Sequence, residues 1–362
     1  MKKRPRPPAP KTSSVPRIAY FLLLLALAGL LSLLAAPRPD LRIRTLRSLL
    51  DTPAPDPNAP PADPDAPETP APIRFATYNL ENFTDGKDDA PDRTPAHAAA
   101  HAALAADIVA EADPAVLFLE EVENADMLLL LNDRLPRPFP AAYLTRLRHS
   151  DGSPDKLNLG LLTRIPPLEV REIAFSRLPL GPARPTRGAI AARFRLAPGR
   201  QLLAYGIHLK SNFGDAPQNQ AKRAIALHLL AIDAETQRLA HAPDQLGVVI
   251  LGDTNVDPEL DEFAADPSLL PLAGAYSDLW LGRPLEERTT LPARAAGDPA
   301  LVFRPACFDR IFASRGLLEA PWRFAPPVAV QRGVATTDNL VKPGDQGHAS
   351  DHHLVYADLL PE

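Results

Sequence analysis

Polar residues with catalytic potential follow apolar runs in this sequence. The run "VVILGDTN" leads into Asp253 and Asn255, and "AYGIHLKS" leads into His208 and Lys210. Because alternate side chains of a β-strand point to the same face, the members of each pair can face one spot. The ends of two predicted strands thus offer a carboxylate, an amide, an imidazole and an ammonium group.

Four further apolar runs carry polar residues in the same way. Two of these runs end in Asn79 and in Glu120 with Glu121. A third contains Asp309, and the fourth comes directly after Asp351 and His352. Carboxylate and amide oxygens suit Mg²⁺, which binds through one or two carboxylates plus substrate phosphate. A metal would neutralise charge on the phosphoryl oxygens while a carboxylate orients the attacking water. Histidine can transfer the proton, and Arg187 in "PTRGAI" can bind a phosphate oxygen. These residues predict hydrolysis of a phosphate ester.

The order of these motifs resembles that of the endonuclease/exonuclease/phosphatase superfamily, which has the deoxyribonuclease-I-like fold. The resemblance extends from residue 73 to residue 360. It is carried by "YNLEN", "LEEVEN", "TRGAI", "IHLKS", "GDTN", "FDRIF" and "SDHH". Each motif alone is weak, because GD followed by TN is common in turns. The complete ordered set is specific.

The resemblance implies a metal site and a role for each of its ligands. Glu121 would be the main ligand, with Asn79 and Asp351 close to the same ion. The ion would be Mg²⁺, with Mn²⁺ or Ca²⁺ as alternatives. Many relatives have Gln at the position of Glu120, so two adjacent acids compete for the ligand role. Strand alternation allows only one of them to face the site, and we assign the role to Glu121. Glu120 is then a solvated or supporting residue.

The resemblance also implies catalytic and substrate-binding roles. Asp253 and Asn255 would position the water and the scissile phosphate. His352, oriented by Asp309, would act as base or as transition-state stabiliser, and His208 would contact the phosphate from the other side. The residues expected to bind substrate are Arg187, Lys210 and Asn158.

The pattern of apolar runs predicts one α+β domain. Helices are expected from Thr94 to about Ala112 and from Asp215 to Leu239, and six short apolar runs read as strands. Such a mixture favours sheets packed face to face with helices outside. The resemblance implies a four-layer α/β/β/α sandwich of two mixed β-sheets flanked by helices.

The N-terminal part of the chain predicts attachment to a membrane. Residues 1–17 are basic, residues 18–36 are nineteen uncharged residues that could cross a bilayer, and residues 37–72 form a juxtamembrane segment and Pro-rich linker. Residues 73–362 form the catalytic domain. The charge distribution places this domain outside the cytoplasmic membrane; cleavage of the segment as a signal peptide, giving a secreted protein, is the alternative.

Charge and cysteine content limit the function. Residues 73–362 carry 29 Lys and Arg against 38 Asp and Glu, which disfavours binding of nucleic acid through a broad basic surface. A nuclease whose metal supplies local positive charge remains compatible. The single Cys307 excludes an intrachain disulfide and is expected to be buried.

Three functions remain. The first is a phosphodiesterase or nuclease acting on nucleic acid outside the cytoplasm, and this is favoured. The second is a phosphatase or phosphodiesterase of lipid or small-molecule phosphate head groups, and the third is a non-catalytic surface binding protein on the same scaffold. The expected partners are a phosphate-ester substrate and, through the N-terminal helix, a membrane. Nothing in the sequence indicates an oligomer.

Overall fold

The computed structural model describes residues 51–52, 71–87, 93–149, 151–176, 178–241, 246–295, 302–319, 321–338 and 340–361. The predicted basic segment 1–17 and membrane span 18–36 lie outside these residues, as does most of the predicted linker 37–72. Within the described part of the chain, no helix is long and apolar enough to cross a membrane.

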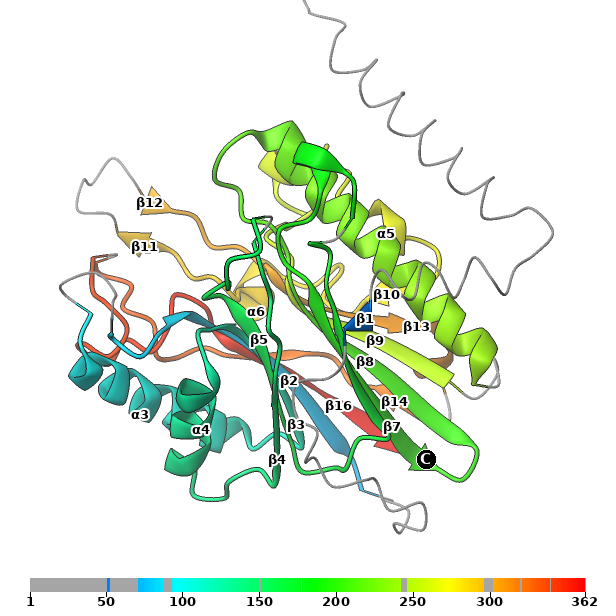
Figure 1. Cartoon of the computed structure of the whole chain (residues 1–362), viewed down its shortest axis with the longest axis horizontal. Coiled ribbons are helices and arrows are strands. Elements are labelled where there is room, and N and C mark those ends of the chain that lie inside the picture. The colour runs from blue at the N-terminus through cyan, green and yellow to red at the C-terminus, as the bar shows by residue number, and fades with distance from the viewer. Residues whose placement is uncertain are drawn as a thin grey trace, which may run out of the picture. The chain divides into compact units, whose positions relative to one another are not determined.

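Two seven-stranded sheets form the body of the molecule (Figure 1). The first has the order β1 (Asp51–Thr52), β6 (Glu169–Ile173), β7 (Ala189–Ala197), β8 (Arg200–His208), β9 (Leu246–Asp253), β13 (Asp309–Ser314) and β10 (Tyr276–Asp278). The second contains β14 (Trp322–Phe324), β16 (Leu354–Pro361), β2 (Ile73–Phe83), β3 (Val116–Val122), β5 (Asn158–Thr163) and β4 (Ala141–Leu144), with β15 (Val328–Val330) paired to β16. Both sheets are mixed, because β8 runs parallel to β9 and β2 parallel to β3.

Helices cover the outer faces of both sheets (Figure 1). Helices α3 (Pro95–Ala112) and α4 (Ala125–Arg134) share a hydrophobic cluster with β2 and β3. Helix α5 (Ala216–Ala240) covers the other sheet, where its Asp233 binds Arg171 of β6 and Tyr205 of β8. A short helix α6 (Leu285–Arg288) and a hairpin of β11 (Arg294–Ala295) and β12 (Val302–Phe303) complete the described elements. The predicted α/β/β/α sandwich is confirmed.

Local capping fixes both predicted helices. The Thr94 side chain accepts a hydrogen bond from the His97 amide at the start of α3, and Asp113 ends that helix in a left-handed conformation. The Asp215 side chain accepts from the Gln218 amide, 2.9 Å away, at the start of α5. Helix α4, which is ten residues long and is capped by Asn124, was not predicted.

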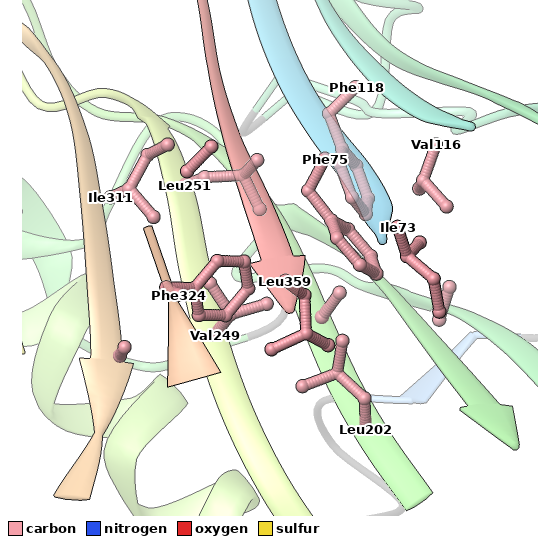
Figure 2. Close-up of a cluster of buried hydrophobic side chains, with 14 of the residues drawn as sticks. Ile73, Phe75, Val116, Phe118, Leu202, Val249, Leu251, Ile311, Phe324 and Leu359 are labelled. Carbon is pink, nitrogen blue, oxygen red and sulfur yellow. The ribbon is translucent and has the colours of Figure 1, made fainter. Parts of the chain in front are cut away.

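The main core lies between the two sheets. It contains the inward-facing residues of both, including Phe75 and Phe118 from one sheet and Leu202, Val249 and Leu251 from the other (Figure 2). Alternate residues of the same strands face outward, so that Leu117 of β3 packs in the helix-covered cluster. Cys307 is buried in the inter-sheet core, as predicted.

Strand register collects the polar strand ends at one edge. In the first sheet, Asp253 lies opposite His208 on one side and Asp309 on the other. In the second sheet, Asn79 lies opposite Glu120. A hydrogen bond of 3.2 Å from Asn79 Nδ2 to Asp253 Oδ2 connects the two sheets at this edge.

Candidate active site

Asp253 lies at the centre of the polar edge. Its Oδ1 accepts from the Asn255 amide at 2.8 Å, and its Oδ2 accepts from the Asn255 side chain at 2.9 Å. Asn255 adopts φ 55°, so it reaches Asp253 from a left-handed turn and not from strand alternation. Burial and the negative charge of Asp309 raise the pKa of Asp253 to about 6, although His352 opposes the shift. Asp253 can therefore change its ionisation close to neutral pH.

His352 and Asp309 form a buried pair. His352 Nδ1 lies 2.7 Å from Asp309 Oδ2, and both residues are almost completely buried. Burial by itself lowers the pKa of His352, but the Asp309 carboxylate outweighs this effect and raises that pKa well above its ordinary value. His352 is therefore protonated at neutral pH. It is suited to stabilise negative charge or donate a proton. Of the two roles that the sequence left open, base and transition-state stabiliser, this charge state favours the second.

His208 has the opposite charge state. Burial first, and then the positive charge of Arg187, lower the pKa of His208 well below its ordinary value. Arg187 Nη1 lies 2.6 Å from His208 Nε2 and also donates to the Leu209 carbonyl at 2.8 Å. The same His208 nitrogen lies 3.4 Å from Asp253 Oδ2 and 3.6 Å from Glu121 Oε1. Arg187 thus supplies the fixed positive charge here, beside a neutral imidazole.

Both acids of the "LEEVEN" motif turn toward the site region, which corrects the expectation that alternation admits only one. The register of β3 against β5 shifts between Leu119 and Val122, and Glu121 has φ 64°. This bulge brings Glu121 near His208 while Glu120 stays on the inter-sheet face of the strand. Glu121 keeps some exposure and can act as a metal ligand.

Glu120 is buried and not solvated. Its side chain is 0% exposed, and Thr77 donates a hydrogen bond to its Oε1. Burial, and then the charge of Asp309, raise its pKa well above the ordinary value, which favours the neutral carboxylic acid form. Thr77 was not predicted; it lies two residues before Asn79, on the same face of the strand, and this spacing could have indicated it.

The donors predicted for a divalent metal fit Mg²⁺ in their chemistry. Glu121 and Asp351 provide carboxylates and Asn79 an amide oxygen, and both carboxylate side chains retain exposure. Ser350 donates to the Asn79 carbonyl at 2.7 Å, which attaches the loop carrying Asp351 to β2. Among the described residues there is no group of three or more His, Cys, Asp or Glu arranged to hold an ion. The donor set suits a cation that keeps several waters.

Three residues beside Asp351 were not predicted as part of the site. His348 Nε2 lies 2.8 Å from Glu81 Oε2, while Arg294 Nη1 lies 3.8 Å from Asp351 Oδ2 and 4.0 Å from Glu81 Oε1. His348 is completely buried. Glu81 lies two residues after Asn79, a spacing that could have indicated it. No feature of the sequence indicated that Arg294, which lies on β11, would be part of the site.

Two predicted substrate-binding residues have their polar groups occupied by the protein. The Asn158 side chain donates to the Glu123 and Asp155 carbonyls and accepts from the Leu147 amide, and it is only 5% exposed. It therefore joins three chain segments. The Lys210 ammonium group donates to two carbonyls and a hydroxyl within its own loop, so strand alternation does not bring it onto the spot that His208 faces.

Two buried residues of the site have ionisation states that suit a base and an acid. Above pH ~6 ionised Asp253 can take a proton from water, while protonated His352 can give one to a leaving oxygen. Asn255 and Asn79 hold the Asp253 carboxylate in place. A bound divalent ion would add charge stabilisation on the phosphoryl oxygens.

The fold and the site define a class of protein: a two-sheet α+β sandwich with a hydrolytic carboxylate, amide and histidine cluster at one edge. The sequence profile of the Endonuclease/Exonuclease/phosphatase family matches residues 76–352. The chain belongs to this family and is a hydrolase of phosphate esters. A comparison with curated proteins gives no match.

Solved structures share the fold at low sequence identity. TDP2 from D. rerio, complexed with single strand DNA product, is 22% identical with a TM-score of 0.53, covering 80% of this chain and 98% of that chain. SmcL is 17% identical with a TM-score of 0.54, covering 80% of this chain and 100% of its own. Sphingomyelinase C from Streptomyces griseocarneus is 16% identical with a TM-score of 0.52, covering 79% and 99%. At these identities the similarity establishes the fold alone.

Proposed function

We propose that this chain is a Mg²⁺-dependent phosphodiesterase or nuclease that acts on nucleic acid outside the cytoplasm. The observation that carries the proposal is the meeting of two residue sets at one edge. The second sheet supplies the metal donors Asn79 and Glu121, and the first sheet supplies Asp253 and its neighbours His208 and Asp309. The hydrogen bond between Asn79 and Asp253 brings the two sets together.

Each residue has a role in the proposed reaction. Ionised Asp253 accepts the proton of the attacking water, and Asn255 keeps the carboxylate oriented. Arg187 binds a non-bridging phosphate oxygen, and protonated His352 donates to the leaving oxygen. Mg²⁺, with Mn²⁺ or Ca²⁺ as alternatives, would be held by Glu121, Asn79 and Asp351 and would stabilise charge on the phosphate.

The choice of nucleic acid has separate support. The structural relative TDP2 was solved with a single strand DNA product. Arg187 adds a cation directly beside His208, which supplies local positive charge on an otherwise acidic body. The extracytoplasmic location rests on the nineteen uncharged residues 18–36 and the basic segment before them. Protease added to intact cells that express the chain should degrade it if the body lies outside.

A lipid or small-molecule phosphodiesterase is the second candidate. Its support is the structural similarity to SmcL and Sphingomyelinase C, together with the predicted membrane segment. Under this alternative the same site would hydrolyse a phosphate head group at the membrane surface.

One experiment separates these functions. The full-length chain is assayed with Mg²⁺ and with EDTA on plasmid DNA, RNA, bis(p-nitrophenyl) phosphate and sphingomyelin vesicles. We expect Mg²⁺-dependent cleavage of nucleic acid that Asp253→Ala and His352→Ala abolish. Cleavage of sphingomyelin alone would support the lipid enzyme, and no hydrolysis by folded protein would support a binding protein. Equal activity of the wild type and both variants would refute the site.

A further inference from the structure

The loop between β8 and α5 presents an exposed aromatic ring beside the candidate active site. The Phe213 side chain is 86% exposed, and it is the single aromatic residue among the large hydrophobic side chains exposed in the described part of the chain. The adjacent Asn212 donates a hydrogen bond of 2.9 Å to the carbonyl of Asn255, a residue of the site. Phe213 follows only five residues after His208. The loop that carries the ring is therefore joined to the catalytic edge.

Hydrogen bonds hold this loop in a defined shape. The Phe213 carbonyl accepts from both Lys210 Nζ at 3.0 Å and Asn219 Nδ2 at 2.9 Å. Arg223 donates to the Lys210 carbonyl and to Asn212 Oδ1, both at 3.0 Å, and is itself buried in an ion pair with Asp266. These bonds fasten both sides of the loop, and in this conformation the ring is exposed. The ring stays in water, where it can receive a ligand.

Basic residues lie near the loop, and two of them, Lys210 and Arg223, are bonded within the protein. Burial lowers the pKa of Lys210, and the nearby positive charges of Arg187, Lys222 and Arg223 lower it further, which places these basic groups in one region. Arg187 also contacts His208 in the site. An exposed aromatic ring on a loop with basic residues nearby, next to the candidate active site, is compatible with the way in which proteins bind single strands, where basic groups follow the phosphates and rings stack on bases.

We propose that Phe213 is a stacking platform for an unpaired base next to the scissile phosphate, so that the preferred substrate is single-stranded nucleic acid. This inference rests on the proposed nuclease function and specifies its substrate. A duplex keeps its bases stacked and offers no free face to the ring. Insertion into a membrane needs a broad apolar face, whereas the neighbours of Phe213 are Ser211, Asn212, Gly214 and Asp215.

The test compares strands with and without bases. The full-length wild type, Phe213→Ala and Phe213→Trp are assayed with Mg²⁺ on an oligothymidylate and on an abasic strand of equal length. We expect the wild type to prefer the strand with bases, and Phe213→Ala to raise its KM by about 5- to 100-fold, which removes the preference. Phe213→Trp should keep it, since its ring also stacks.

Leu239→Ala is the matched control, because Leu239 is also exposed but lies at the far end of α5. It should keep the wild-type preference, and all variants should keep the wild-type melting temperature.

An unchanged preference in Phe213→Ala, with active wild type, would overturn this inference alone. If the wild type cleaves bis(p-nitrophenyl) phosphate but neither strand, the proposed nuclease function fails, and the inference fails with it. If Phe213→Ala instead loses binding to phosphatidylglycerol vesicles with unchanged strand kinetics, the ring binds lipid.

Discussion

At the scale of single residues, charge state separates side chains of the same type. Glu120 and Glu121 are adjacent, but only Glu120 is completely buried, and its burial keeps it protonated. His208 and His352 lie near the same aspartate, but burial, together with Arg187, lowers the pKa of the first, while Asp309 raises the pKa of the second. The surroundings of each group, and not its type, decide its chemistry.

The two glutamates should therefore respond differently to the same substitution. Glu120→Gln replaces a neutral acid with a neutral amide of similar shape, so activity should stay within about threefold of wild type. Glu121→Gln removes a carboxylate from the metal donors and should lower kcat/KM by about 100-fold or more. Activity titrated against Mg²⁺ measures both effects. Loss of activity in Glu120→Gln with full activity in Glu121→Gln would reverse the assignment.

Asp309 should set the alkaline limit of activity. Its carboxylate raises the pKa of His352, so Asp309→Asn lowers that pKa, and His352 loses its proton at a lower pH. We expect the fall of kcat at high pH to move toward neutrality, with a loss of about 100-fold at neutral pH. The pH dependence of kcat, measured alongside His228→Ala as a helix histidine control, checks this. A profile that keeps its wild-type alkaline limit would contradict the proton-donor role.

At the scale of elements, the close approach of strands sets the position of the site. Gly252 precedes Asp253 in β9 and adopts φ 138°, where a Cβ atom would lie 2.0 Å from the Ile207 carbonyl oxygen of β8. Only glycine allows β8 and β9 to pair here, and this pairing puts His208 opposite Asp253.

Gly252→Ala should therefore destabilise the protein by more than about 2 kcal/mol and also reduce activity, because the strands must separate. Gly316→Ala is the matched control, since a Cβ at Gly316 meets nothing within 4 Å and its φ is not positive. That change should stay within about 0.5 kcal/mol of wild type. Urea unfolding measures both free energies. Similar stability of the two variants would show that the strand pairing tolerates a side chain.

Helix α3 should make stability sensitive to acid. His101 packs edge-on against Phe83, and burial lowers its pKa to about 3 from about 6.5. Between these pH values the unfolded chain binds a proton that the folded protein does not, so stability falls as pH falls, by up to about 1.4 kcal/mol per pH unit. His101→Gln should flatten this slope between pH 6.5 and 4. Unfolding free energies at several pH values test it, and an equal slope in wild type and variant would exclude His101 as the cause.

At the scale of the whole molecule, the site exists only because two sheets pack face to face. The predicted metal donors Asn79 and Glu121 come from one sheet and Asp253 and Asp309 from the other, and the inter-sheet core of Figure 2 holds the two sheets together. A ligand that binds these assembled residues must stabilise the folded state.

Mg²⁺ should accordingly raise the free energy of unfolding, by about 2.7 kcal/mol when its concentration is 100 times its dissociation constant. The shift should disappear in Glu121→Gln and persist in Glu120→Gln, because only Glu121 is assigned as a ligand. Thermal unfolding with Mg²⁺ or EDTA provides the measurement, and it does not depend on catalysis. An equal Mg²⁺ shift in Glu121→Gln would place the bound ion elsewhere.

The sequence by itself determined the fold class, the two main helices, six of the strands and the polar residues at their ends, because apolar periodicity and caps are local properties of the chain. Only the tertiary structure decided which groups are buried and which charges face them. It turned Glu120 inward, attached Asn158 and Lys210 to backbone groups, and added Arg294 from a distant hairpin. These contacts join residues far apart in the sequence, and burial and charge act through space, so no local pattern encodes them.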